Sequence, residues 1–258
     1  MKTSRRRFII GFGAMTAALG TRARAQGYIL EQTYDLGKQG ALYRLRFEAG
    51  AAGMVRCLAA VLPRNSFRAA ILEQPERAGS LTAVRDLARK SGARVAINGG
   101  RFNGAFAPDG LLIVNGKTIG RKRADWNGAL TIDGSGRATV TTSPDLRTAQ
   151  YAVQGSPTLV DSNGAMGVMR EDRERFRRTV IAQSGDLIIA MVTSPVSLYE
   201  LAYLLVEFPD AFFVHRIDTA LNLSGAAATG LYAKLSDGTE IEERSSWPNR
   251  DVIAFFAR

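Results

Sequence analysis

Short runs separated by tight-turn sequences dominate this chain of 258 residues. The clearest turn is Asn115-Gly116, which lies between the runs 111–114 and 117–119 and is typical of a two-residue hairpin connection. Comparable turn sequences occur at 133–136, 161–164, 184–186 and 236–238. Successive hairpins build antiparallel sheets, whereas a doubly wound parallel sheet requires alternating strands and helices, and that alternation is absent here.

Two segments have a helical pattern instead. Apolar residues within 81–88 share one helical face, and we expect Ser80 to cap this helix at its start and Gly92 to close it. Ser197–Glu200 forms a capping box that opens a second apolar helix, which ends before Pro209. The sequence therefore predicts an α+β fold: a single domain with an antiparallel, hairpin-rich sheet and a few packing helices.

The N-terminal residues 1–25 have the organisation of an export signal. A basic stretch that includes Arg5–Arg7 precedes the apolar segment 8–20, and small residues within 23–25 provide a cleavage site ahead of Gln26. The apolar segment is shorter than the ~20 residues that a membrane-spanning helix requires, so no integral membrane segment is predicted. The basic stretch resembles the twin-arginine signal. We therefore expect a periplasmic or secreted protein that contacts the twin-arginine export machinery; a disordered basic N-terminus is the alternative.

The net charge of +10 is concentrated in this N-terminal segment. Residues 26–258, the predicted mature chain, contain 28 basic and 24 acidic residues, which gives a net charge of +4. No stretch there combines clustered Lys and Arg with aromatic residues, so binding to nucleic acid is not predicted. The mature chain is long enough to bury one core and contains no Pro- or Ser-rich linker. One domain over 26–258 is therefore expected, with residues 26–50 as an edge subregion.

A single cysteine and a single histidine restrict the chemistry. Cys57 has no second cysteine with which to form an intrachain disulfide or a cysteine-rich zinc site, and its apolar neighbours indicate a buried position. His215 has no second histidine with which to share a metal ion. Acid–base chemistry is therefore expected from carboxylates, or from a Lys or Tyr with a shifted pKa. No cofactor is predicted, although a divalent metal would assist the departure of a phosphate.

Glycines and polar residues adjoin several predicted strands. The strand 94–97 ends at Asn98–Gly100, where the backbone can approach a ligand and the Asn side chain can bond to hydroxyl groups. Arg178 precedes another strand and has a planar guanidinium suited to phosphate. Residues 222–225 lead into a small-residue turn that can hold an anion. The structural alternatives for these three features are an ordinary tight turn, a solvated charged face and close packing.

Six short blocks follow one another along the chain: Ile97–Phe102, Gly110–Lys117, Ala152–Val160, Arg178–Ala182, Ser197–Ala202 and Ala220–Gly225. Together and in this order they resemble the phosphodiester glycosidase family, over roughly residues 60–257. The resemblance implies hydrolysis of a glycosidic bond whose leaving group is a phosphate ester. The substrate would then be a carbohydrate or a sugar phosphate.

The resemblance also implies which residues form the site. The catalytic positions would include Asn98, Arg178, Asn222 and Ser224, and the substrate-binding positions would be Gly99, Gly100, Phe102, Gly155, Pro157 and Gly225. Arg178 and the backbone amides near the glycines would bind the phosphate. A carboxylate would stabilise the oxocarbenium-like sugar.

The sequence departs from the family pattern at Ser224, where the family commonly has Asp. A hydroxyl at this position removes a charge that would act as base, nucleophile or partner of the oxocarbenium ion. The candidates for a substitute carboxylate are Asp218, which lies six residues before Ser224, Asp109 and Glu200, and of these Asp218 is the catalytic candidate. The expected function is an exported phosphodiester glycosidase-like hydrolase that cleaves a sugar-1-phosphodiester or a related envelope glycan. The alternative is a catalytically degenerate periplasmic protein that binds such a glycan.

Overall fold

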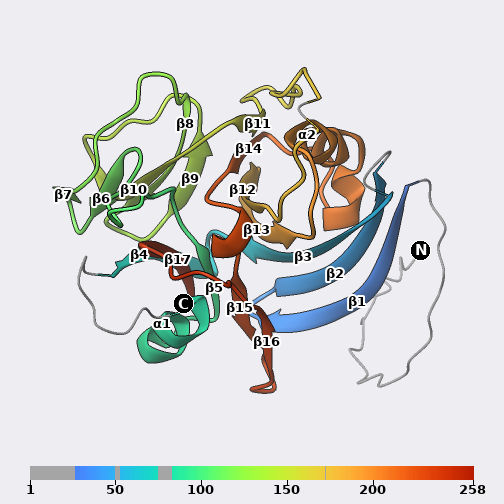
Figure 1. Ribbon diagram of the computed structural model, residues 1–258. Coiled ribbons are helices and arrows are strands. Elements are labelled where there is room, and N and C mark those ends of the chain that lie inside the picture. Colours follow the sequence, from blue (N-terminus) through green and yellow to red (C-terminus); the bar gives the residue numbers. More distant parts are fainter. Residues whose placement is uncertain (1–26, 50–52, 75–82, 172) are drawn as a thin grey trace, which may run out of the picture.

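The computed structural model describes residues 27–49, 53–74, 83–171 and 173–258. The predicted signal peptide, residues 1–25, and the predicted helix cap Ser80 lie outside the described residues. The described chain forms three antiparallel sheets and two α-helices, the mostly antiparallel arrangement that the turn sequences predict (Figure 1).

The largest sheet has seven strands, and its edge strand comes from the N-terminal part of the chain. In spatial order its strands are β1 (Tyr28–Gly37), β2 (Gly40–Ala49), β3 (Gly53–Pro63), β13 (Leu187–Thr193), β12 (Thr179–Ser184), β14 (Thr219–Asn222) and β11 (Thr158–Val160). The predicted edge subregion 26–50 therefore supplies the first two strands of this sheet.

Two five-stranded sheets complete the fold. The first has the order β7 (Lys117–Thr118), β6 (Leu112–Val114), β10 (Ala149–Gly155), β8 (Gly128–Asp133) and β9 (Ala138–Thr141). The second has the order β16 (Glu240–Glu243), β15 (Leu231–Lys234), β5 (Val95–Asn98), β17 (Asp251–Ala257) and β4 (Phe67–Glu73). In this second sheet, strands from the beginning, middle and end of the chain pair with one another.

The helices begin and end at recognisable signals. Helix α2 (Leu198–Glu207) opens with the predicted capping box, in which the Ser197 hydroxyl accepts from the Glu200 amide and the Glu200 carboxylate accepts from the Ser197 amide. Helix α1 (Val84–Ser91) ends at the left-handed Gly92, as predicted. Its start differs from the prediction, because Ala83 occupies the N-cap and provides no side-chain bond.

Two further single turns of 3-10 helix occur in the described chain, η2 (Pro209–Phe212) and η3 (Ala226–Ala228). The hairpin turn also forms as expected, since Asn115 and Gly116 both have positive φ, 52° and 74°, between β6 and β7.

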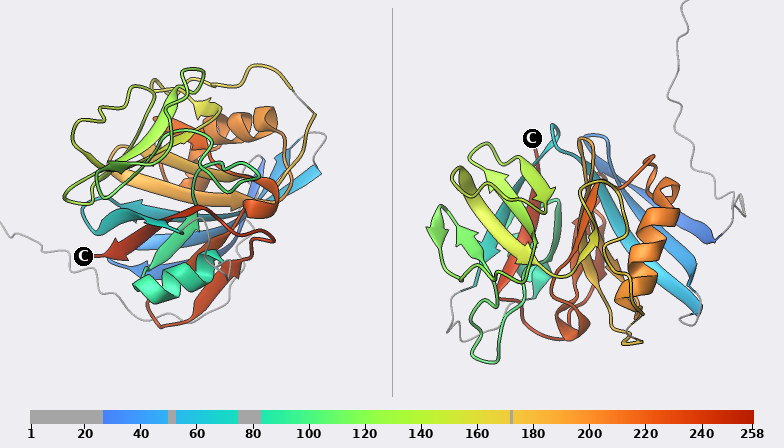
Figure 2. Two further views of the ribbon diagram at one scale, coloured as in Figure 1. Left: turned by 60° about the vertical axis from the view of Figure 1, so that its left-hand side comes forward. Right: turned by 90° about the horizontal axis from the view of Figure 1, so that it is seen from above.

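Buried apolar residues from all three sheets meet in one interior cluster. The opposite face of the seven-stranded sheet is covered by α2, while α1 packs against β5, β15 and β17. Seen from above, α2 and the β6–β10 sheet lie on opposite sides of the molecule (Figure 2). This packing brings the C-terminal ends of β5, β10 and β14 together near the start of β12.

Candidate functional site

Asn98, the last residue of β5, is the centre of a buried polar cluster. Its side chain is fully buried, and its Nδ2 donates to the main-chain oxygen of Ser224 at 2.7 Å. Its Oδ1 accepts from the Thr179 hydroxyl at 2.6 Å and from the Gly230 amide at 3.0 Å. One side chain thereby connects β5 to the start of β12 and to both ends of the turn that follows β14.

The turn after β14 lies against the glycine pair that follows β5. The Ser224 amide donates to the Gly99 oxygen at 3.2 Å, and the Ala226 amide donates to the Arg177 oxygen at 2.8 Å. A Cβ atom at Gly225 would lie 2.9 Å from that same Arg177 oxygen, closer than side chains normally approach. The small residue at 225 therefore allows this turn to pack against the start of β12.

The end of β10 joins the same cluster. Gly155 precedes a cis Ser156–Pro157 bond, and the Ser156 amide donates to the Asn222 oxygen at 2.9 Å. The Asn222 Nδ2 donates back to the Ser156 oxygen at 2.9 Å. Among the described residues, the buried Asn222 Oδ1 and the nearby Thr229 Oγ1 have no hydrogen-bond partner.

A buried carboxylate, Asp251, lies beside the glycine pair Gly99–Gly100. The sequence alone did not predict a role for this residue. It opens β17, is 2% exposed, and accepts the Gly100 amide on Oδ2 at 3.0 Å. Its main-chain oxygen accepts the Gly99 amide at 2.9 Å. Burial raises the pKa of Asp251 to about 6, against the opposing effects of the Gly100 bond and the Arg250 charge. This carboxyl group therefore titrates in the range useful for acid–base catalysis.

Asp251 and a second carboxylate, Asp109, line the same cleft, which in this structure is too narrow to hold a water molecule. The cleft is lined by Arg101, Asp109, Gln154 and Asp251, among other residues. Asp109 pairs with Arg123 at 3.1 Å, and Arg101 Nε lies 4.0 Å from its other oxygen. The sequence offers three candidates for the substitute carboxylate. Of these, the fold brings Asp109 close to the glycine pair.

The other two substitute carboxylates lie elsewhere. Asp218 precedes β14, at the opposite end of that strand from Ser224, and its oxygens pair with Arg216 at 2.9 Å and accept the Gly185 amide at 2.7 Å. Glu200 is held in the capping box and pairs with Arg175 at 2.9 Å. The structure therefore does not bring Asp218 to Asn98, although the two had been expected in one site.

Arg178 and the glycine amides adjoin the cluster, but their hydrogen bonds differ from those expected. Arg178 is 8% exposed, and its guanidinium donates to the main-chain oxygens of Val196 at 3.2 Å and Glu174 at 3.0 Å. The amides of Gly99 and Gly100, predicted to bind phosphate, both donate to Asp251. In this structure these groups hold the site together, because their donors are directed at protein oxygens.

Phe102 lies in the loop that follows the glycine pair. Its ring makes an edge contact with Phe106, with the centroids 5.0 Å apart, and its main chain bridges to Pro108. The loop therefore folds back on itself next to the cleft. Phe102 is half-buried there, which leaves part of its ring accessible.

In the part of the chain that the structure describes, no group of three or more His, Cys, Asp or Glu side chains is arranged to hold a metal ion. No helix there is long and apolar enough to cross a membrane. Cys57 is 3% exposed, as its apolar neighbours predict, and burial raises the pKa of its thiol far above the usual range.

The raised pKa of Asp251 predicts a measurable dependence of stability on pH. The folded state binds the proton more tightly than the unfolded state, so stability falls as pH rises from about 4 to about 6. Compared with Asp251→Asn, the wild type should lose about 3 kcal/mol of unfolding free energy across this window and little above it. Urea titrations of both proteins at several pH values measure the difference. If the unfolding free energies of the two proteins changed with pH in the same way, the raised pKa of Asp251 would be contradicted.

Similarity to solved structures supports this fold. A hypothetical protein from Synechocystis aligns with a TM-score of 0.65 and 14% identity, over 85% of this chain and 62% of that one. The catalytic domain of zebrafish N-acetylglucosamine-1-phosphodiester alpha-N-acetylglucosaminidase, auto-inhibited by its pro-peptide, aligns with a TM-score of 0.61 and 14% identity, over 90% of this chain and 89% of that one. The chain thus spans less than two thirds of the Synechocystis protein.

No curated protein sequence matches this chain significantly. The model of the phosphodiester glycosidase family matches residues 91–256, which include all the strand ends that meet at Asn98. The family resemblance predicted from the six sequence blocks is therefore confirmed over most of its predicted extent. This chain belongs to the phosphodiester glycosidase family.

Proposed function

We propose that this protein is an exported hydrolase that cleaves a sugar-1-phosphodiester or a related envelope glycan. Family membership supports the reaction class. The observation that carries the proposal is the cluster around Asn98, where strand ends from separate sequence blocks meet beside a cleft with two carboxylates. Two carboxylates are what hydrolysis of a glycosidic bond normally requires.

In this proposal Asp251 and Asp109 take over the role of the carboxylate that the family commonly has at position 224. A water oxygen forms a bond to the anomeric carbon, the bond from that carbon to the phosphate oxygen breaks, and the phosphate ester departs as an anion. Asp251, whose pKa is about 6, accepts the proton of the attacking water. This step requires the cleft to widen, because in this structure it is too narrow to hold a water molecule. Asp109 adds negative charge for the oxocarbenium-like sugar.

The phosphate of the substrate needs a cation at the cleft, and Arg101 fits this role. It follows the glycine pair directly, lines the cleft, and its side chain is 55% exposed. Arg178 is less suited, since its guanidinium donates to main-chain oxygens. We therefore expect Arg101 to favour anionic ligands.

A second candidate function is glycan binding without cleavage. Two observations favour it: Ser224 presents a hydroxyl where the family commonly has a carboxylate, and Asp251 is almost completely buried with Oδ2 bonded to Gly100. Binding without turnover would follow if Asp251 did not reach the substrate.

Sugar release from an N-acetylglucosamine-1-phosphodiester tests the proposal. Residues 26–258 should release free N-acetylglucosamine, and Asp218→Asn, which changes a carboxylate outside the cluster, should release it at the wild-type rate. If only the Ser224→Asp variant released sugar, the wild-type site would be one that has lost its carboxylate. This result would favour glycan binding without cleavage. If neither the wild type nor the Asp218→Asn and Ser224→Asp variants released sugar, hydrolysis of this substrate would be contradicted.

Export is the remaining part of the proposal, and it rests on residues 1–25. Fractionation of cells that produce the full chain should recover the protein outside the cytoplasm, shortened by its N-terminal segment. A chain that starts at residue 26 serves as the control and should stay inside the cell. Recovery of the full chain in the cytoplasm at full length would contradict export.

A further inference from the structure

A second polar cavity lies far from the Asn98 cluster, at the other end of the same strands. Its volume is about 600 Å³, and it is bordered by the end of α1 and by β15, β16 and β17. Arg94, which lines it, precedes β5, whereas Asn98 ends that strand. Lys234, which also lines it, ends β15, whereas the start of β15 pairs with the Asn98 end of β5. The cavity is therefore separate from the candidate active site.

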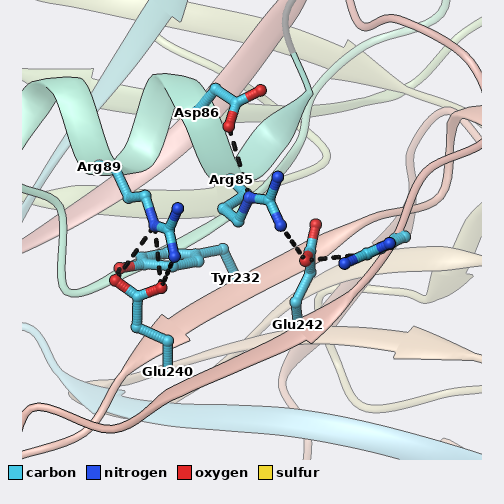
Figure 3. Close-up of polar contacts among 7 residues, drawn as sticks. Arg85, Asp86, Arg89, Tyr232, Glu240 and Glu242 are labelled. Carbon is cyan, nitrogen blue, oxygen red and sulfur yellow. Dashed lines mark hydrogen bonds and ion pairs between the residues drawn. The ribbon is translucent and has the colours of Figure 1, made fainter.

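The cavity carries a strong excess of positive charge. Its charged lining consists of Arg68, Arg89, Arg94, Lys234 and a single carboxylate, Glu240. Arg89 Nε donates to Glu240 Oε2 at 2.9 Å, and Figure 3 shows both side chains next to Tyr232. The remaining three cations give the cavity a net charge of about +3 at neutral pH.

Neutral groups contact two of the three remaining cations, Arg94 and Arg68. Arg94 Nη1 donates to the main-chain oxygens of Lys234 and Leu235, at 3.2 Å and 2.8 Å. The Arg68 guanidinium lies 4.3 Å from the centroid of the Phe256 ring. Among the described residues, neither Arg68 nor Lys234 forms an ion pair with a carboxylate. Carbonyl oxygens orient Arg94 and an aromatic ring orients Arg68. Asp35 attracts Arg94 and Glu240 attracts Lys234, so their charges are offset in part, but the lining keeps an excess of positive charge for a ligand.

Tyr232 completes the wall of the cavity. Its hydroxyl donates to Glu240 Oε1 at 2.9 Å, and burial together with Glu240 raises its pKa to about 12. The hydroxyl therefore remains neutral at physiological pH and keeps Glu240 directed toward Arg89 (Figure 3). Glu240 thus accepts from both Arg89 and Tyr232, and it also attracts Lys234 electrostatically.

We propose that this cavity is a second binding site, which holds an anionic sugar unit of a glycan through its phosphate or carboxylate groups. The volume is in the range of small-molecule sites, and guanidinium groups match the paired oxygens of both anions. A site at the far end of β5 and β15 would anchor a polymer while another part of it reaches the Asn98 cluster. The proposal does not require turnover at that cluster.

The test measures the affinity of residues 26–258 for polygalacturonate and for a linear sugar-phosphate polymer, at low salt, by calorimetry. Arg68→Gln combined with Lys234→Gln should weaken binding of at least one polymer about tenfold or more. The matched control is Lys90→Gln combined with Lys122→Gln, which removes the same charge from exposed sites outside the cavity and should change affinity less than twofold. The polymer that responds distinguishes carboxylate from phosphate recognition.

The proposal would be overturned by equal weakening in the control variant, by equal affinity for neutral dextran, or by no binding of either polymer. Tighter binding of single-stranded DNA through Arg68 and Lys234 would also overturn it, in favour of a nucleic-acid site. Because these measurements involve no hydrolysis, failure of the proposed activity and failure of this site are distinguished directly.

Discussion

Replacing Asn98 by alanine should destabilise the protein by about 4 kcal/mol, because three hydrogen bonds in a fully buried position are lost together. Each former partner, on Ser224, Thr179 and Gly230, would remain buried without a replacement, and each such group costs about 1–3 kcal/mol. For a domain of this size the melting temperature should fall by roughly 10 °C. Urea and thermal unfolding of both proteins measure the effect.

Thr179→Val is the matched control for Asn98→Ala. It removes one donor to Asn98 Oδ1 and leaves the two bonds to Ser224 and Gly230, so it should cost about 1 kcal/mol. If Asn98→Ala costs no more than Thr179→Val, then Asn98 does not organise the cluster. Asn98→Asp provides a further check, because it keeps an acceptor and replaces the Nδ2 donor with an oxygen that faces the Ser224 carbonyl.

Asp251→Asn should lower kcat for sugar-phosphodiester hydrolysis by about 100-fold or more, the usual contribution of a positioned base. The fold should survive, because the Asn oxygen still accepts the Gly100 amide. The wild-type rate should rise with pH through about 6, as the carboxyl group ionises, and this dependence should disappear in the variant. A variant with wild-type kcat would show that Asp251 is not the base.

Gly99→Ala gives an independent test of how Asp251 is held. A Cβ atom at residue 99 would lie 1.7 Å from Asp251 Oδ2, so the carboxylate must move away from the Gly100 amide. We expect a loss of activity similar to that of Asp251→Asn, measured in the same kinetic assay. Full activity of Gly99→Ala would mean that the observed position of the carboxylate is not required.

Local features of the fold were predictable because their physical cause is local. Asn115-Gly116 specifies its turn through positive φ at two adjacent residues, and Ser197 and Glu200 satisfy each other's amides within one helical turn. The start of α1 was less predictable. Ala83 caps it without a side-chain bond, so the sequence provides no polar residue that marks the first turn.

The candidate site depends on strand pairings between residues that are far apart in the sequence. Asp251 lies 151 residues from Gly100 and reaches it only because β17 pairs with β5. Asp218 shows the opposite case. It is six residues from Ser224, but the extended strand β14 separates them by roughly 20 Å. Closeness in sequence therefore favoured a carboxylate that lies away from the Asn98 cluster. An acidic residue at the first position of the apolar strand 251–257 is the sequence signal that points to Asp251.

The most direct test of the account is to map where a sugar phosphate binds. Amide chemical shifts of residues 26–258 would be followed by NMR during titration with N-acetylglucosamine 1-phosphate. The account predicts that the amides of Gly99, Gly100, Arg101 and Gly225 shift first and together, and that Asp218 does not respond. Shifts confined to residues outside the Asn98 cluster, with these amides unchanged at saturation, would contradict it.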